Sequence, residues 1–120
     1  MKFTSFNPLI ITKDAAAAIR LFEALGFEKK HTHSTPGGFV DTTMKDANGF
    51  QVDIADVPNT PRDHTIIRIN VDDFDEAYEF LTARGFVHPS GTVEEDESSK
   101  STMMVSPSGF AFDLAYHKKK

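Results

Sequence analysis

The stretch NGFQVD at residues 48–53 occurs a second time, sixty positions later, as SGFAFD at residues 108–113. In each copy a small polar residue and a glycine favour a turn, and a short alternating strand follows. Alternation along a strand places the aspartate of each copy on the face opposite its phenylalanine. The two copies predict that the chain is an internal duplication of a unit that ends in this strand.

A second spacing repeats outside these copies. Asp14 and Asp73 each precede a Gly-Phe pair by twelve residues, at Gly26 and Gly85. Aspartate is a favourable N-cap, and glycine is common just past the end of a helix. The spacing therefore predicts helices over 15–25 and 74–84.

The remaining segments are predicted from alternation and turn residues. Around the first helix, strands are expected over 3–12, 27–33, 39–45 and 50–55. Around the second, they are expected over 65–71, 102–106 and 110–116, and residues 86–88 are expected to begin a further strand. A turn is expected at 35–38, and the acidic run at 94–97 is expected to be a solvated loop.

The 120 residues are expected to form a single domain. Module 1 covers residues 1–56, a proline-containing linker covers 57–63, and module 2 covers 64–120. Each module has the order strand, helix and three strands, and neither is large enough to close a core alone.

Composition excludes several classes of protein. A net charge of -5 argues against a nucleic-acid partner, because a surface that follows phosphates needs an excess of lysine and arginine. The sequence has no cysteine, which removes disulfides and thiolate metal sites. With no apolar run long enough for a membrane span and no signal peptide pattern, we expect a cytoplasmic protein without a membrane partner. The lysines at 118–120 are expected to be a solvated tail.

The predicted strands each have one apolar face and one mixed face. In the strand over 50–55, for example, Val52 and Ile54 oppose Gln51, Asp53 and Ala55. Two interpretations of the mixed face remain open: it is exposed to solvent, as in many antiparallel sheets, or it is the concave side of a curved sheet that holds a ligand.

Three segments together resemble a known superfamily. They are LIITKD at residues 9–14, RLFEALGFE at 20–28 and DANGFQVD at 46–53. The chain resembles the vicinal oxygen chelate superfamily, which includes glyoxalase I, bleomycin-resistance proteins and extradiol dioxygenases. The resemblance covers nearly the whole chain. It implies an α+β fold of two tandem βαβββ modules, whose curved mixed sheet lines a cleft and carries the helices on its outer face, with a homodimer as a possible assembly.

The resemblance also implies positions for a metal. Metal-dependent members take ligands from the first and last strand of each module, which here correspond to Asn7, Asp53, Ile66 and Asp113. Ile66 cannot bind a metal, and Asn7 is a weak neutral donor. Two carboxylates and an amide could hold Mg²⁺ or Mn²⁺, but no imidazole is supplied for zinc, iron or nickel. We therefore expect no metal cofactor, with a divalent ion as the less favoured alternative.

Two further groups of side chains are candidates for binding. His31 and His33 point the same way on one strand, and with His64 they could form a metal site, but exposed hairpin histidines are the favoured interpretation. Arg68 shares a face with Ile66 and Asn70, and it could pair with an aspartate, clamp an anionic ligand, or do both.

The leading hypothesis is a metal-free protein of the glyoxalase and bleomycin-resistance type that binds a small organic ligand in the cleft. The expected ligand-binding residues are Asn7, Asp53, His64, Arg68 and Asp113. The alternative is an enzyme of the same superfamily, of lyase, isomerase or dioxygenase type, that uses a divalent metal or a cleft carboxylate as general base. A third hypothesis is a structural role in which side chains fill the cleft. The sequence does not identify the ligand, the catalytic residues or the oligomeric state.

Overall fold

The computed structural model describes residues 1–34, 38–91 and 93–118, which form two compact units. The N-terminal unit comprises residues 7–65, and the C-terminal unit comprises residues 1–6 together with residues 66–120. Strand β1 (Phe3–Thr12) therefore contributes its first residues to one unit and its remainder to the other. Each unit is described here by itself.

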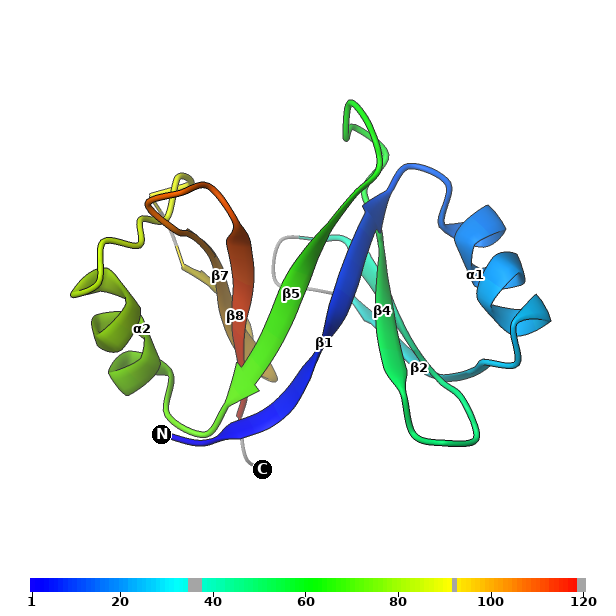
Figure 1. Cartoon of the computed structure of the whole chain (residues 1–120), viewed down its shortest axis with the longest axis horizontal. Helices are drawn as coiled ribbons and strands as arrows, with labels where there is room; N and C mark the ends of the chain where they lie inside the picture. The colour runs from blue at the N-terminus through cyan, green and yellow to red at the C-terminus, as the bar shows by residue number, and fades with distance from the viewer. Residues whose placement is uncertain (35–37, 92, 119–120) are drawn as a thin grey trace. The chain divides into compact units, whose positions relative to one another are not determined.

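The N-terminal unit is a four-stranded mixed sheet with one helix (Figure 1). Its elements are β1, α1 (Ala15–Ala24), β2 (Glu28–Ser34), β3 (Val40–Lys45) and β4 (Gln51–Asp56). The strand order is β2-β3-β4-β1, in which β1 and β4 run parallel and the other neighbours are antiparallel.

The C-terminal unit repeats this arrangement. Its elements are β5 (His64–Val71), α2 (Phe74–Thr82), β6 (Glu94–Glu95), β7 (Ser99–Val105) and β8 (Ala111–His117). The strand order is β5-β8-β7-β6, and β5 and β8 are the parallel pair. The predicted α+β class and the two βαβββ repeats are confirmed.

Matched capping and turn contacts explain why the repeats fold alike. The side chains of Asp14 and Asp73 each accept a hydrogen bond from a backbone N–H in the first turn of their helix, both at 3.1 Å. Gly49 and Gly109 adopt φ values of 86° and 108°, a region in which only glycine is unstrained. The predicted caps and turns are therefore present.

The cores of the two units have the same plan but different sizes. In the N-terminal unit Met44, Val52 and Ile54 are buried, and α1 covers them without burying any of its own residues fully. The C-terminal core has seven buried residues, of which α2 contributes three: Ile69, Val71, Phe74, Ala77, Leu81, Met104 and Leu114. The C-terminal unit thus has the larger apolar core.

Several predicted boundaries are wrong. Residues 86–88 form no named strand; Val87 makes only an isolated bridge to Val105. Glu94 and Glu95, expected in a loop, pair with β7 as the short strand β6, where an ion pair from Lys118 to Glu95 at 2.7 Å offsets their charge. The prediction for 35–38 concerns residues that, except for Gly38, lie outside the described part of the chain.

The two faces of the strands also differ from expectation. Phe50, expected on the apolar face of its strand, is 68% exposed and precedes β4 rather than lying within it, and Phe6 of β1 is 62% exposed. The mixed face of the N-terminal unit is not a solvent-exposed face: Asn7, Leu9, Asp53 and Ala55 are all buried. The polar side chains on this face therefore need partners within the protein.

None of the helices formed by the described residues is long and apolar enough to cross a membrane.

Candidate functional site

A hydrogen-bonded network of polar side chains lies on the mixed face of the N-terminal unit. Asp53 Oδ1 accepts hydrogen bonds from Thr43 Oγ1 at 2.9 Å and from Gln51 Nε2 at 3.1 Å. Gln51 Nε2 also donates to Asn7 Oδ1 at 3.2 Å, and Asn7 Nδ2 donates to the Pro8 carbonyl at 2.9 Å. Asn7 and Asp53, two of the predicted site residues, are thus joined through Gln51.

Strand register explains how these residues meet. Thr43 stands directly opposite Asp53 on the neighbouring antiparallel strand, and Leu9 stands beside Asp53 on the parallel one. Side chains two residues apart on a strand share a face, so Gln51 and Asn7 lie in the same layer. Asp53 is 2% exposed and Asn7 is 3% exposed, so these two residues are almost fully removed from water, whereas Gln51 is half-buried.

The equivalent face of the C-terminal unit carries an ion pair. Arg68 Nε donates to Asp113 Oδ2 at 2.7 Å, and these two residues are paired in the β5–β8 register. Their side chains are only 11% and 16% exposed, so water screens the charges weakly. The predicted pair of Arg68 with an aspartate is therefore present.

Asn70 lies two residues from Arg68 on the same face of β5. Its Nδ2 donates to Ser5 Oγ at 2.5 Å, while its Oδ1 is buried without a hydrogen-bond partner in the described part of the chain. An unpaired buried acceptor costs about 1–3 kcal/mol.

The histidine metal site, the less favoured of the two interpretations, does not form among the described residues. His31 and His33 have ring centroids 6.1 Å apart, but no group of three or more histidine and acidic side chains there could hold a metal ion. His64 is exposed, and its Nδ1 lies 3.2 Å from the Arg62 carbonyl oxygen. It joins neither polar cluster.

The residues at the family's metal positions do not fit a metal. Ile66 offers no donor atom, and the Arg68 guanidinium beside Asp113 places a positive charge where a cation would have to bind. In the other unit, Asp53 Oδ1 and Asn7 Oδ1 already accept hydrogen bonds from Gln51. A metal would have to displace these contacts and would gain few ligands in return.

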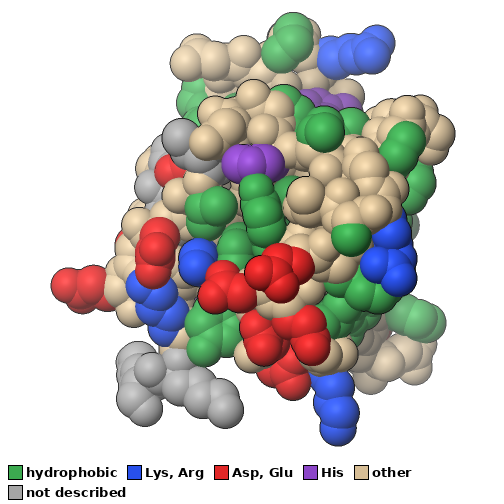
Figure 2. All heavy atoms as spheres, turned by 90° about the vertical axis from the view of Figure 1, so that its left-hand side faces the viewer, with side chains coloured by type: hydrophobic (Ala, Val, Ile, Leu, Met, Phe, Trp, Pro, Cys, Tyr) green, Lys and Arg blue, Asp and Glu red, His purple; other side chains and the backbone are tan. Residues whose placement is uncertain are grey.

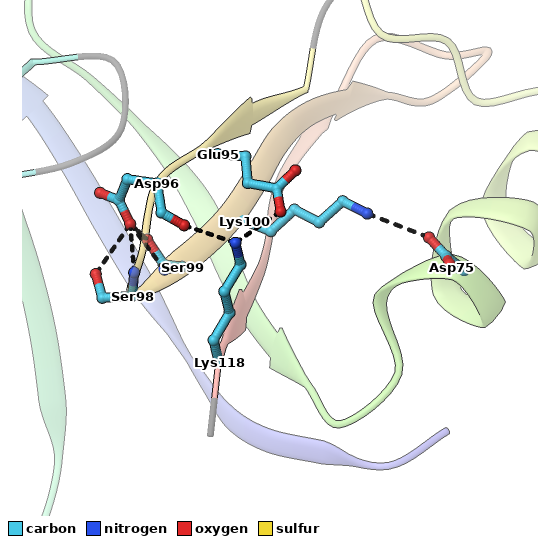
Figure 3. A network of polar contacts seen from close by, with 7 residues as sticks. All are labelled: Asp75, Glu95, Asp96, Ser98, Ser99, Lys100 and Lys118. Atoms are coloured by element: carbon cyan, nitrogen blue, oxygen red, sulfur yellow. Dashed lines mark hydrogen bonds and ion pairs between the residues drawn. The ribbon is translucent and has the colours of Figure 1, made fainter. Parts of the chain in front are cut away.

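A third polar group lies at the β6–β7 hairpin of the C-terminal unit (Figure 3). The backbone N–H groups of Ser98 and Ser99 donate to Asp96 Oδ1, both at 2.8 Å, and they hold the pKa of Asp96 below its usual value. Lys118 donates to the Asp96 carbonyl at 2.7 Å, and its ion pair lowers the pKa of Glu95.

Acidic side chains also gather on the surface around α2 (Figure 2). Asp72, Asp73, Asp75 and Glu76 are exposed at the start of this helix, where the positive end of the helix dipole favours them. These acidic side chains stabilise the start of α2, just as the polar contacts at Asp96 and Glu95 stabilise the hairpin.

Sequence reasoning did not assign Thr43 or Gln51 to the site. Gln51 could have been found, because it precedes Asp53 by two residues and so shares its face. Thr43 could not, because its position opposite Asp53 depends on the β3–β4 register.

Comparison with known proteins gives the family. The family model of the Glyoxalase/Bleomycin resistance protein/Dioxygenase superfamily matches residues 5–114. The chain therefore belongs to this superfamily, as the resemblance in its sequence indicated. No curated protein matches it.

Solved structures share the fold at low sequence identity. A point mutant of glyoxalase I from Zea mays superposes with a TM-score of 0.70 at 16% identity, covering 98% of this chain and 45% of that one. Methylmalonyl-CoA epimerase from Mycobacterium tuberculosis gives 0.71 at 14% identity, covering 98% and 90%. A superfamily member from Vibrio splendidus 12B01 gives 0.63 at 16%, covering 96% and 99%. The chain thus spans about half of the maize enzyme and nearly the full length of the other two.

Proposed function

We propose that this chain binds a small organic ligand on its polar strand faces and does so without the metal centre of the metal-dependent superfamily members. The observation that carries the proposal is the polar Asn7–Gln51–Asp53–Thr43 network, in which Asn7, Thr43 and Asp53 are buried and Gln51 is half-buried. Buried polar groups seldom add stability over apolar side chains of similar volume. They do fix side chains in one orientation, which a binding site requires.

The C-terminal unit supports the proposal with different chemistry. The Arg68–Asp113 pair holds a guanidinium and a carboxylate together on one strand face. Such a pair offers hydrogen-bond donors and acceptors whose geometry is fixed by the protein. The superfamily includes bleomycin resistance proteins as well as enzymes, and this membership is compatible with a binding role.

Side-chain amide signals in an NMR experiment test the proposal. A library of small polar and aromatic molecules is expected to contain members that shift the Asn7 and Gln51 amide signals. The amides of Asn48 and Asn59, which lie in exposed turns, serve as controls and are expected to stay unchanged. A library whose members shift none of the network signals, or shift the control amides equally, would contradict the proposal.

Calorimetric titration tests the metal-free part. Mg²⁺, Mn²⁺, Zn²⁺ and Ni²⁺ are expected to show no tight stoichiometric binding, because the donor set is incomplete and Arg68 repels cations. Tight binding of any of these ions that is abolished by Asp53→Ala would overturn this part.

A second candidate is an enzyme that uses a carboxylate as general base. Asp53 favours it, because two neutral donors orient its carboxylate as a positioned base requires. Asp53→Asn should then abolish turnover measured in the presence of a chelator. Activity that survives both Asp53→Asn and Asp113→Asn would exclude this candidate.

A homodimer and a cytoplasmic location remain proposals. Light scattering of the purified chain tests the first, and microscopy of a tagged chain tests the second.

A further inference from the structure

The orientation of the Gln51 amide is fixed by the chemistry of its neighbours. Both hydrogen atoms of Nε2 are used, one toward Asp53 Oδ1 at 3.1 Å and one toward Asn7 Oδ1 at 3.2 Å. An ionised carboxylate can only accept hydrogen bonds. The opposite orientation would place the Gln51 oxygen against the Asp53 oxygen with no hydrogen between them.

Asn7 fixes the same orientation independently. Its Nδ2 donates to the Pro8 carbonyl, which can only accept, so its Oδ1 must face Gln51. An acceptor at Asn7 again requires the nitrogen of Gln51. Assigning amide nitrogen and oxygen normally depends on the hydrogen-bond network, and here the carboxylate and the carbonyl give the same assignment.

It follows that Gln51 Oε1 points away from the network. Gln51 is half-buried, and its Oε1 is not among the buried side-chain atoms that lack a partner in the described part of the chain. The two bonds through Nε2 are the only hydrogen bonds of this side chain among the described residues. The amide therefore presents an accessible acceptor that is held in one direction.

We propose that Gln51 contacts the ligand, and that its Oε1 accepts a hydrogen bond from a ligand hydroxyl or N–H group. This inference rests on the proposed function, since it assigns the ligand class of the same polar face. The N-terminal unit thus selects molecules that carry a hydrogen-bond donor.

Thr43, Asp53 and Asn7 act as positioning residues for this acceptor. Thr43 Oγ1 donates to the same carboxylate oxygen that holds Gln51, so it fixes Asp53, and Asp53 in turn fixes the amide. Removing the Thr43 hydroxyl would loosen Gln51 without removing the acceptor itself.

Two matched pairs of probes test the ligand class. Phenol and anisole differ in whether the oxygen carries a hydrogen, and so do the nitrogens of N-methylacetamide and N,N-dimethylacetamide. Each probe is titrated into the whole chain while the side-chain amide signals of Gln51 and Asn7 are followed. The donor of each pair is expected to bind about 5- to 10-fold more tightly than its methylated partner.

Variants separate contact from positioning. Gln51→Met keeps the length of the side chain and removes the acceptor, so it should abolish the preference for donors. Thr43→Val should reduce the preference, and Thr43→Ser, which keeps the hydroxyl, should restore it. A merely structural role for Thr43 would change stability while leaving the ratio of the two affinities unchanged.

The outcomes distinguish this inference from the proposed function. If methylated and unmethylated probes bind equally well, or if Gln51→Met keeps the preference, the assignment of Gln51 is overturned while ligand binding stands. If neither pair shifts any network signal, the assignment fails; the library experiment then decides ligand binding separately.

Discussion

Asp53 and Asp113 occupy equivalent places in the two units but are held by different neighbours. Beside Asp53 on the parallel strand stands Leu9, whereas Arg68 stands beside Asp113. Opposite Asp53 on the antiparallel strand stands Thr43, whereas Met103 stands opposite Asp113. Asp53 accepts hydrogen bonds from the neutral donors Thr43 and Gln51, whereas Asp113 accepts one from the charged Arg68 guanidinium.

The apolar face of the same strands shows no such divergence. Met44 and Met104 are both 0% exposed, and so are Ile54 and Leu114. A buried threonine stands opposite the aliphatic residue in each unit: Thr42 opposite Ile54 and Thr102 opposite Leu114. Packing under the helix therefore keeps the buried residues of the two repeats similar. The opposite face of the same strands carries different polar and charged side chains in the two units.

The largest expected effects come from the two cores. Leu114→Ala and Ile54→Ala should each lower the free energy of unfolding by about 2–5 kcal/mol. Leu114→Ala should lie nearer the upper limit, because more buried residues surround it. Urea unfolding measures both, with Leu25→Ala at a position 62% exposed as control. Equal losses would show that the difference in core size has no energetic meaning.

Breaking the charged pair should have the next largest effect. Arg68→Met leaves the partly buried Asp113 carboxylate without this partner and should cost about 3 kcal/mol. The double variant Arg68→Met with Asp113→Leu should recover at least half of that loss, because both charges of this pair are then removed. Chemical denaturation of both variants measures the recovery. A double variant no more stable than Arg68→Met would mean that Arg68 serves other partners.

The smallest effect concerns the β6–β7 hairpin, whose counterpart in the other unit is the antiparallel pair β2–β3. The pKa of Asp96 is lowered in the folded chain, so its contribution is present above the ordinary value near 3.8 and is lost as pH falls through the lower folded value. Exchange of the Ser98 and Ser99 N–H groups should therefore accelerate below about pH 4. In Asp96→Asn the exchange rates should show no such step; a step of unchanged size would contradict this origin.

Most of the fold could be predicted because its signals are local. Asp14 and Asp73 cap helices within their own first turn, and Gly49 and Gly109 form turns within five residues. The exceptions were segments whose state depends on partners far along the chain. Glu94 and Glu95 look like a solvated loop until Lys118 is placed beside them.

The site was predicted less completely for the same reason. Asp53 and Asp113 could be found because the sequence repeat marks them. Arg68 could be found because strand alternation places it on the mixed face of its strand. Gln51 was placed on the correct face, but its role depends on Asn7, which lies 44 residues away. Alternation gives the face of a side chain, whereas register decides which atoms it meets.

The division of β1 between the two units has a consequence during synthesis. Lys2 and Asp72 bond to each other twice, from Lys2 N to Asp72 Oδ1 at 2.7 Å and from Asp72 N to the Lys2 carbonyl at 3.1 Å. Lys2 and Asp72 are 70 residues apart, so at a ribosomal rate of about 5–20 residues per second Lys2 waits for about 4–14 seconds before Asp72 exists. During that time this segment, with the exposed rings of Phe3 and Phe6, is an unpaired strand available to chaperones or to neighbouring nascent chains.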